Sequence, residues 1–85
     1  MKFRLVYTHR AIKDIEKLDP ATRHRIDKAL LRFEEDPLAH AEKLIDPRLG
    51  TYRFRVGAYR VIFDLEGNDL VVLRVGHRRE IYRKR

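Results

Sequence analysis

The sequence predicts an α+β fold with the element order β-α-α-β-β-β. In this fold a two-helix hairpin packs on one face of a mainly antiparallel four-stranded sheet. Three observations predict it: apolar side chains alternate over residues 2–7, recur at helical spacing over residues 8–36, and alternate again over residues 51–77. With 85 residues, the chain is long enough for one domain, residues 1–85, and too short for two.

The first predicted strand covers residues 2–7, where Phe3, Leu5 and Tyr7 fall on one face. Thr8 follows and is a good N-cap, because its hydroxyl can accept a hydrogen bond from a free backbone N–H of the next helix. Apolar side chains then recur along one helix face: Ala11, Ile12, Ile15 and Leu18. These features predict a strand that leads directly into a helix.

A second helix is predicted to begin at Asp19, which is a favourable N-cap, with Pro20 at the first helical position. We expect it to end at Asp36–Pro37, because a residue that precedes proline avoids helical backbone angles. Its buried face is predicted to consist of Ile26, Ala29, Leu30 and Phe33. The two helices would therefore form an αα-hairpin.

The remaining irregular segments are residues 37–50 and the basic tail, residues 78–85. Neither has the periodicity of a helix or a strand. We expect the first of them to be held against the core by its apolar side chains, Leu38, Leu44, Ile45 and Leu49.

Residues 51–56 and 59–65 both alternate, and Gly57–Ala58 between them suits a two-residue hairpin turn with glycine first. This turn fixes the register of the two strands. It places Val56 opposite Tyr59, Arg55 opposite Arg60, and Phe54 opposite Val61. The aromatic and aliphatic side chains then face the helices.

The same register places Arg53, Arg55 and Arg60 together on the other face of the sheet, which we expect to be partly bare. Like charges on neighbouring strands destabilise a sheet, so this arrangement favours an anion-binding site. The alternative is that the long side chains extend into water and are screened there.

The last strand, residues 70–77, has two possible registers. A turn with an odd number of residues after Glu66 would bury Val71, Leu73 and Val75, and would place Arg74 and Arg78 beside Arg60. An even number would reverse every side chain. We favour the odd turn, because it buries more apolar area.

Composition excludes several classes of protein. The chain has no cysteine and no serine, which excludes disulfides, thiolate metal sites and a serine nucleophile. His9, His24 and His40 are scattered, so neither a metal site nor a cofactor is expected. Residues 1–7 do not resemble a signal peptide, and no apolar stretch approaches the roughly 20 residues that span a bilayer. We therefore expect a cytoplasmic protein that has no membrane partner.

Charge points to a polyanionic partner. The formal net charge is +7, and residues 51–85 hold nine Lys and Arg residues against four Asp and Glu residues. Eight of those nine cations are arginines, whose guanidinium groups bind phosphate oxygens in a two-pronged geometry. A highly charged but otherwise ordinary soluble surface is the alternative.

Residues 52–63, YRFRVGAYRVIF, followed by residues 75–82, VGHRREIY, resemble the RelE/ParE superfamily of type II toxins. The order of elements and Lys43–Leu44 before the second strand are similar too. The resemblance covers nearly the whole chain and is most specific in its last 35 residues. It implies the two-helix and sheet fold that the residue pattern predicts independently.

The resemblance also implies a function. RelE-like toxins enter the ribosome and cut mRNA without a metal, by attack of the ribose 2′-hydroxyl on its own phosphate, and a cognate antitoxin inhibits them in a hetero-oligomer. By motif match, Arg60, Arg78 and Tyr82 fall on the catalytic residues of the family. Arg53 and Arg55 match two lysines of its best-known member and retain affinity for phosphate. Together with Arg74 and Arg79 they form the expected RNA-binding set.

Such a reaction needs a base, an acid and a cation that stabilises the phosphorane. Arginine supplies the last of these but does not exchange its proton. The candidates for proton transfer are therefore Tyr82, whose phenolate would be favoured by nearby cations, and His77, which titrates near neutrality. His77 could equally be a packing residue at the strand end, and Tyr82 an anchor for the tail.

Two other functions remain open at this stage. A ParE-like toxin would share the fold but inhibit DNA gyrase. A non-catalytic nucleic-acid-binding module would keep the cationic face without cleaving RNA. The set of Arg60, Arg78 and Tyr82 favours the endoribonuclease.

Overall fold

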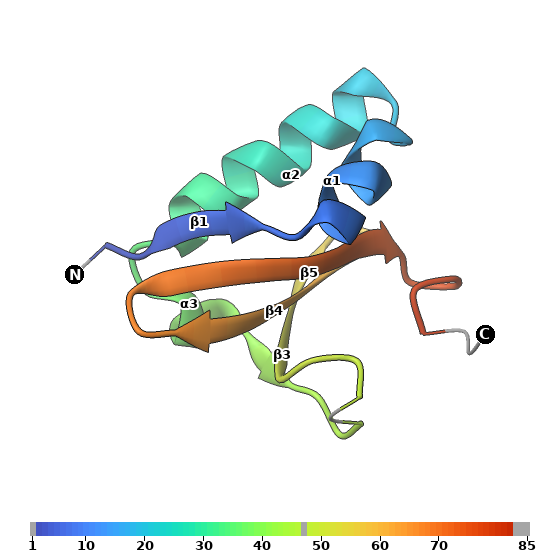
Figure 1. Ribbon diagram of the computed structural model, residues 1–85. Coiled ribbons are helices and arrows are strands. Elements are labelled where there is room, and N and C mark those ends of the chain that lie inside the picture. The colour runs from blue at the N-terminus through green and yellow to red at the C-terminus, as the bar shows by residue number, and fades with distance from the viewer. Residues whose placement is uncertain (1, 47, 83–85) are drawn as a thin grey trace.

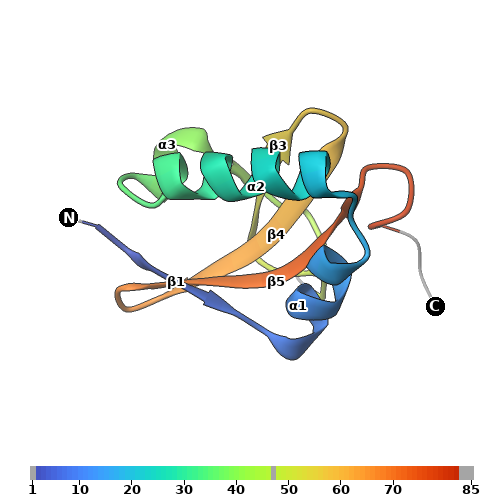
Figure 2. The same cartoon turned by 90° about the horizontal axis from the view of Figure 1, so that it is seen from above.

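The computed structural model describes residues 2–46 and 48–82. Its sheet has the strand order β1-β5-β4-β3-β2, and Figure 1 shows β1, β5 and β4 running side by side. Helix α2 lies across one face of this sheet (Figure 2). Along the chain the elements are β1 (Arg4–Tyr7), α1 (His9–Glu16), α2 (Pro20–Phe33), α3 (Pro37–His40), β2 (Glu42–Lys43), β3 (Tyr52–Val56), β4 (Tyr59–Glu66) and β5 (Asp69–His77).

The predicted α+β class is confirmed, although the described part of the sheet has five strands rather than four. The additional strand is β2, which has two residues and pairs antiparallel with β3. The first strand pairs with β5 in parallel, and the remaining neighbours are antiparallel. A two-residue strand has no readable alternation, which is why the sequence pattern missed it.

The predicted helix starts are confirmed. The Thr8 hydroxyl accepts a hydrogen bond from the Ala11 N–H at 3.1 Å, and the Asp19 carboxylate accepts one from the Thr22 N–H at 3.2 Å. Helix α2 ends at Phe33, earlier than expected, and Pro37 begins the short helix α3. No helix in the described ranges is long and apolar enough to cross a membrane.

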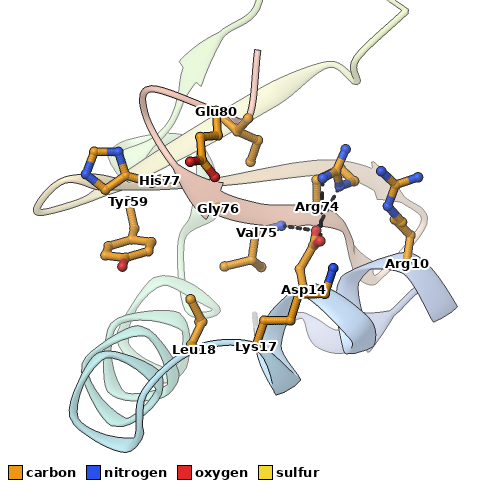
Figure 3. Close-up of a pocket in the computed structure, with 11 residues that line it drawn as sticks. Arg10, Asp14, Lys17, Leu18, Tyr59, Arg74, Val75, Gly76, His77 and Glu80 are labelled. Atoms are coloured by element: carbon orange, nitrogen blue, oxygen red, sulfur yellow. Dashed lines mark hydrogen bonds and ion pairs between the residues drawn. The ribbon is translucent and has the colours of Figure 1, made fainter. Parts of the chain in front are cut away.

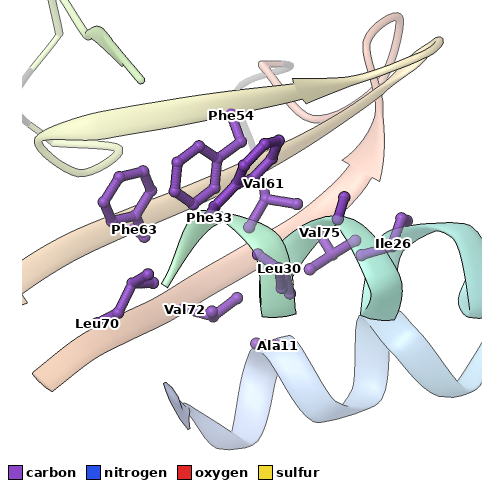
Figure 4. Packing of buried hydrophobic residues seen from close by; sticks show 11 residues of the cluster. Ala11, Ile26, Leu30, Phe33, Phe54, Val61, Phe63, Leu70, Val72 and Val75 are labelled. Atoms are coloured by element: carbon purple, nitrogen blue, oxygen red, sulfur yellow. The ribbon is translucent and has the colours of Figure 1, made fainter. Parts of the chain in front are cut away.

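The core lies between the sheet and the helices (Figure 4). All four predicted apolar residues of α2 are buried in it. Phe54 stacks on Phe63, with ring centroids 4.2 Å apart, and contacts the tilted ring of Phe33 on its other side, at 4.5 Å. Aromatic rings from α2, β3 and β4 are thus buried together, and each contributes a large apolar area to the core.

The hairpin register predicted from Gly57–Ala58 is confirmed, with Arg55 paired to Arg60 and Val56 paired to Tyr59. The predicted register of β5 is wrong in the first half of the strand and correct after a bulge, where Val75 faces the core and Arg74 pairs with Ile62. Only Gly67 and Asn68 separate β4 from β5. Leu73 forms a bulge in β5, because Val72 pairs with Phe63 and Arg74 with Ile62, which leaves Leu73 between them without a partner. Leu70 and Val72 are therefore buried before the bulge, and Val75 after it. A β-bulge inserts one residue into a strand and so changes its alternation midway.

The face of the sheet opposite the helices, here called the second face, carries Arg53, Ile62 and Leu73. It is less bare than expected, because Ile62 is fully buried. Leu38 and Ile45, predicted to contact the core, are exposed instead, Ile45 to 98%. The backbone of Gly50, which is itself buried, covers Ile62 on this face.

Gly50 fits because it has no side chain. Its φ is 150°, and an added Cβ would lie 2.6 Å from Cγ2 of Ile62 and 2.9 Å from Cδ1 of Leu73. We expect Gly50→Ala to lower the free energy of unfolding by about 1–3 kcal/mol, from backbone strain and the clash together. Urea denaturation measures the loss.

Gly67→Ala is the matched control for Gly50→Ala. Gly67 also has a positive φ, of 60°, but no atom lies within 4 Å of an added Cβ. Its substitution therefore reports strain alone, about 1–2 kcal/mol. Equal losses in the two variants would show that packing against Ile62 contributes nothing.

Candidate nucleic-acid interface

Arg53 and Tyr82 meet on the second face. Nη1 of Arg53 donates a hydrogen bond to the Tyr82 hydroxyl at 2.8 Å, and its guanidinium carbon lies 5.7 Å from the centroid of the tyrosine ring. The turn after β5 brings Tyr82 there, since the buried side chain of Ile81 packs against Gly76. A phenol from the end of the chain thus reaches a guanidinium of β3.

Glu42 completes this cluster and was missed by the sequence analysis. Its Oε1 lies 2.9 Å from Nε of Arg53 and 3.1 Å from Nε of Arg55. The hydrogen bond from Arg53 lowers the pKa of Glu42, and the charges of both arginines add to this effect. A carboxylate therefore occupies the place between two guanidinium groups where a phosphate could bind. Strand β2 brings Glu42 to this position, but two residues are too few for a strand to be recognised in the sequence.

The hydroxyl of Tyr82 and the carboxylate of Glu42 act on the same guanidinium. The hydrogen bond to Tyr82 is the main reason that the pKa of Arg53 is raised, while partial burial opposes it and Glu42 adds to it. We call Glu42, Arg53, Arg55 and Tyr82 the Arg53 cluster.

Arg60 is placed differently from the expectation. It lies on the second face opposite Arg55, but it is buried, with only 7% of its surface exposed. Its Nη1 donates hydrogen bonds to the carbonyls of Gly57 at 3.0 Å and Tyr59 at 2.9 Å. The guanidinium therefore holds the β3–β4 turn, and the expected cluster of three exposed arginines is reduced to Arg53 and Arg55.

We expect Arg60→Ala to lower the free energy of unfolding by about 1–3 kcal/mol, because two turn carbonyls lose their donor. Thermal or urea denaturation measures this. Arg55→Ala removes the paired but exposed arginine and should stay within about 0.5 kcal/mol of the unsubstituted protein. Equal stability of the two variants would mean that Arg60 does not support the turn.

Arg74 and His77 line a pocket between β5 and α1 (Figure 3). Nε of Arg74 is 2.8 Å from the Asp14 carboxylate, which also accepts a hydrogen bond from the Val75 N–H at 2.9 Å. Arg74 starts on the second face as predicted, paired with Ile62, but its guanidinium contacts Asp14 of α1 and does not join Arg60. The His77 ring contacts Tyr59 edge-on, with centroids 5.4 Å apart, and it accepts a hydrogen bond from the Arg79 N–H.

Arg78 and Arg79 are exposed in the turn after β5. The Arg78 N–H donates to the carbonyl of Ala58 at 2.8 Å, which places this turn beside the β3–β4 hairpin. Neither side chain forms an ion pair within the described residues. Both are therefore available to a polyanion. Residues 83–85 of the predicted basic tail lie outside the described residues.

The Arg53 cluster offers two cations, a carboxylate and a phenol within one hydrogen-bonded set. These are the groups that acid–base chemistry at a phosphate requires. No group of three or more His, Asp or Glu residues that could hold a metal occurs in the part of the chain that the structure describes. The arrangement is that of a small α+β protein with two arginines, a carboxylate and a phenol gathered on one sheet face.

Comparisons with known proteins identify the class. The sequence profile of the ParE toxin of the type II toxin-antitoxin system parDE matches residues 5–82. Toxin RelG of Mycobacterium tuberculosis is 34% identical over 91 residues, which cover 99% of this chain and 100% of RelG. Both comparisons thus place the chain among toxins of type II toxin-antitoxin systems.

Solved structures agree with the sequence comparison. The toxin-antitoxin complex RelBE2 from Mycobacterium tuberculosis contains a chain that superposes with a TM-score of 0.82 at 25% identity, over 91% of this chain and 99% of that one. The isolated Escherichia coli RelE toxin gives a TM-score of 0.74 at 25% identity, over 88% of this chain and 83% of that one. The chain belongs to the RelE/ParE superfamily and is a toxin of the type II class.

Proposed function

We propose that this toxin is a ribosome-dependent endoribonuclease that cleaves mRNA without a metal and so inhibits translation. The observation that carries the proposal is the pair of contacts at Arg53, to the Tyr82 hydroxyl at 2.8 Å and to the Glu42 carboxylate at 2.9 Å. A cation that holds a phenol on one side and a carboxylate on the other can stabilise a phosphorane between two proton-transfer groups.

The reaction proposed is an in-line transfer within the RNA. The 2′-oxygen forms a bond to phosphorus as its proton leaves, and the bond from phosphorus to the 5′-oxygen breaks as that oxygen gains a proton. The products are a 2′,3′-cyclic phosphate and a 5′-hydroxyl. Arg53 and Arg55 bind the phosphate oxygens in place of the Glu42 carboxylate. Glu42 moves aside and accepts the proton of the 2′-hydroxyl, and the Tyr82 hydroxyl donates a proton to the departing 5′-oxygen.

The other predicted site residues receive different roles in this proposal. Arg78 and Arg79 contact RNA from the turn beside the cluster. Arg60 acts indirectly, by holding the β3–β4 turn through its two carbonyl contacts. Arg74 and His77 lie at the α1 side of β5, and we assign them no part in the transfer.

We also propose that the toxin works in the cytoplasm and is inhibited by a cognate antitoxin in a hetero-oligomer. Several structures similar to this chain are toxin-antitoxin complexes, including RelBE2 of Mycobacterium tuberculosis and RelB-RelE of Methanococcus jannaschii. At 24% identity, the Methanococcus jannaschii complex is similar to this chain in fold alone.

Primer extension on mRNA tests the proposal. Ribosomes stalled with an open A site are mixed with the purified toxin, and the same mRNA without ribosomes serves as the control. We expect cleavage of the ribosome-bound mRNA only, unchanged by EDTA at concentrations that leave the ribosomes intact. The new 3′ end should resist ligation until the cyclic phosphate is removed.

A supercoiling assay with DNA gyrase, run with the same preparation, addresses the ParE-like alternative, because the matching profile is that of ParE toxins. Inhibition of gyrase without mRNA cleavage would overturn the proposal. RNA binding without either activity would identify a non-catalytic binding module instead.

A further inference from the structure

A second cationic site lies in the groove between α2 and β3. The groove has a volume of about 410 Å³. Four cationic residues and no acidic residue line it, and the buried side chains of Ala29 and Phe33 lie at its base. Its lining residues are Arg25, Lys28, Ala29, Arg32, Phe33, Arg55, Val56 and Gly57.

Arg25, Lys28 and Arg32 follow one another along a single side of α2. At 1.5 Å per residue, the first and last are separated by about 10 Å along the helix axis. Arg25 lies over the β3–β4 turn, since a Cβ added to Gly57 would be 2.6 Å from its Nη2. None of the three side chains forms an ion pair within residues 2–46 and 48–82. Their positive charge is thus uncompensated by the described residues.

We propose that the α2–β3 groove binds the phosphate backbone of the RNA strand whose neighbouring nucleotides occupy the Arg53 cluster. The proposal rests on the proposed function, because it takes that cluster as the cleavage site. A row of cations about 10 Å long matches a polymer of phosphates better than a single anion.

Arg55 connects the two sites. Its Nε contacts Glu42 in the Arg53 cluster at 3.1 Å, and the same residue lines the groove. One strand can therefore pass from the second face across β3 to α2 without leaving positive charge. This continuity favours an RNA strand, because its phosphates repeat along its whole length.

Binding of 2′-O-methyl oligouridylate, which lacks the attacking hydroxyl, tests the proposal without cleavage. Fluorescence anisotropy compares a 12-nucleotide and a 4-nucleotide probe over a series of KCl concentrations. We expect Arg25→Ala/Arg32→Ala to weaken binding of the longer probe about tenfold or more. The slope of log K against log salt should fall by about 1.4, that is, about 0.7 for each lost phosphate contact. Binding of the shorter probe, which fits the cluster alone, should not change.

Lys13→Ala/Arg23→Ala is the matched control, because it removes the same charge from exposed positions of α1 and α2 outside the groove. Circular dichroism confirms that both double variants are folded. Equal binding of the longer probe by the two double variants would overturn the proposal. If, in that case, the groove variant but not the control lost binding of a 12-residue polyglutamate, the groove would be a protein-binding site instead.

The same experiment separates this proposal from the proposed function. If the unsubstituted toxin fails to cleave mRNA on ribosomes but the groove variant still loses the longer probe, the groove remains an RNA site and only the cleavage assignment falls.

Discussion

Tyr82→Phe is expected to slow mRNA cleavage on the ribosome by about 10²–10⁴-fold, the range by which proton transfer accelerates such reactions. The change removes one oxygen, which accepts a hydrogen bond from Arg53 at 2.8 Å. The ring that Arg53 faces is kept, so RNA binding and thermal stability should change little. Single-turnover cleavage with excess toxin measures the rate of the chemical step.

Tyr59→Phe is the control for this substitution. Tyr59 packs against the core on the helix side of the sheet, where its ring contacts His77. The Tyr59→Phe variant should therefore cleave mRNA at the rate of the unsubstituted toxin. Similar rates for Tyr82→Phe and Tyr59→Phe would remove the phenol from the mechanism and leave proton transfer to Glu42.

The hairpin and helix caps could be predicted because each depends on residues close together in the chain. Gly57–Ala58 sets the register of β3 and β4 through turn geometry, and this correctly placed Arg55 opposite Arg60. Thr8 and Asp19 accept hydrogen bonds from residues three positions further on. Turns and helix caps of this kind are determined by neighbouring residues, so the sequence predicts them directly.

The errors arose where contacts are distant in sequence. The bulge at Leu73 depends on how β5 fits against β4 and α1, where Asp14 accepts a hydrogen bond from the Val75 N–H. Glu42 reaches Arg53 through a strand of two residues. Arg60 is an error of a different kind, because the carbonyls that its guanidinium contacts, those of Gly57 and Tyr59, are only three positions and one position away. A strand pattern specifies the face on which a side chain starts, but not where a long side chain ends.

The Arg53 cluster depends on the core directly beneath it. Phe54 lies between Arg53 and Arg55 on β3 and points to the opposite face of the sheet, where it is fully buried. Its ring lies between those of Phe33 and Phe63, at 4.5 Å and 4.2 Å. The packing of this one ring therefore sets how firmly β3 holds both arginines of the site.

Phe54→Ala is expected to lower the free energy of unfolding by about 3–5 kcal/mol, from lost burial and the cavity that remains. A small domain has only about 5–15 kcal/mol in total, so a substantial fraction of the variant should be unfolded at moderate urea. Urea denaturation measures the loss. Phe3→Ala, at the half-buried margin of the core, should cost less.

Cleavage by Phe54→Ala distinguishes two ways in which the core supports the site. If β3 is either native or unfolded, cleavage should fall only in proportion to the unfolded fraction, and low temperature should restore it. A lower rate from fully folded protein would mean instead that the cavity lets β3 shift and separates Arg53 from Tyr82. A stability loss below about 1 kcal/mol, by contrast, would show that the core collapses around the missing ring, and the aromatic stack would then not be what holds β3 in place.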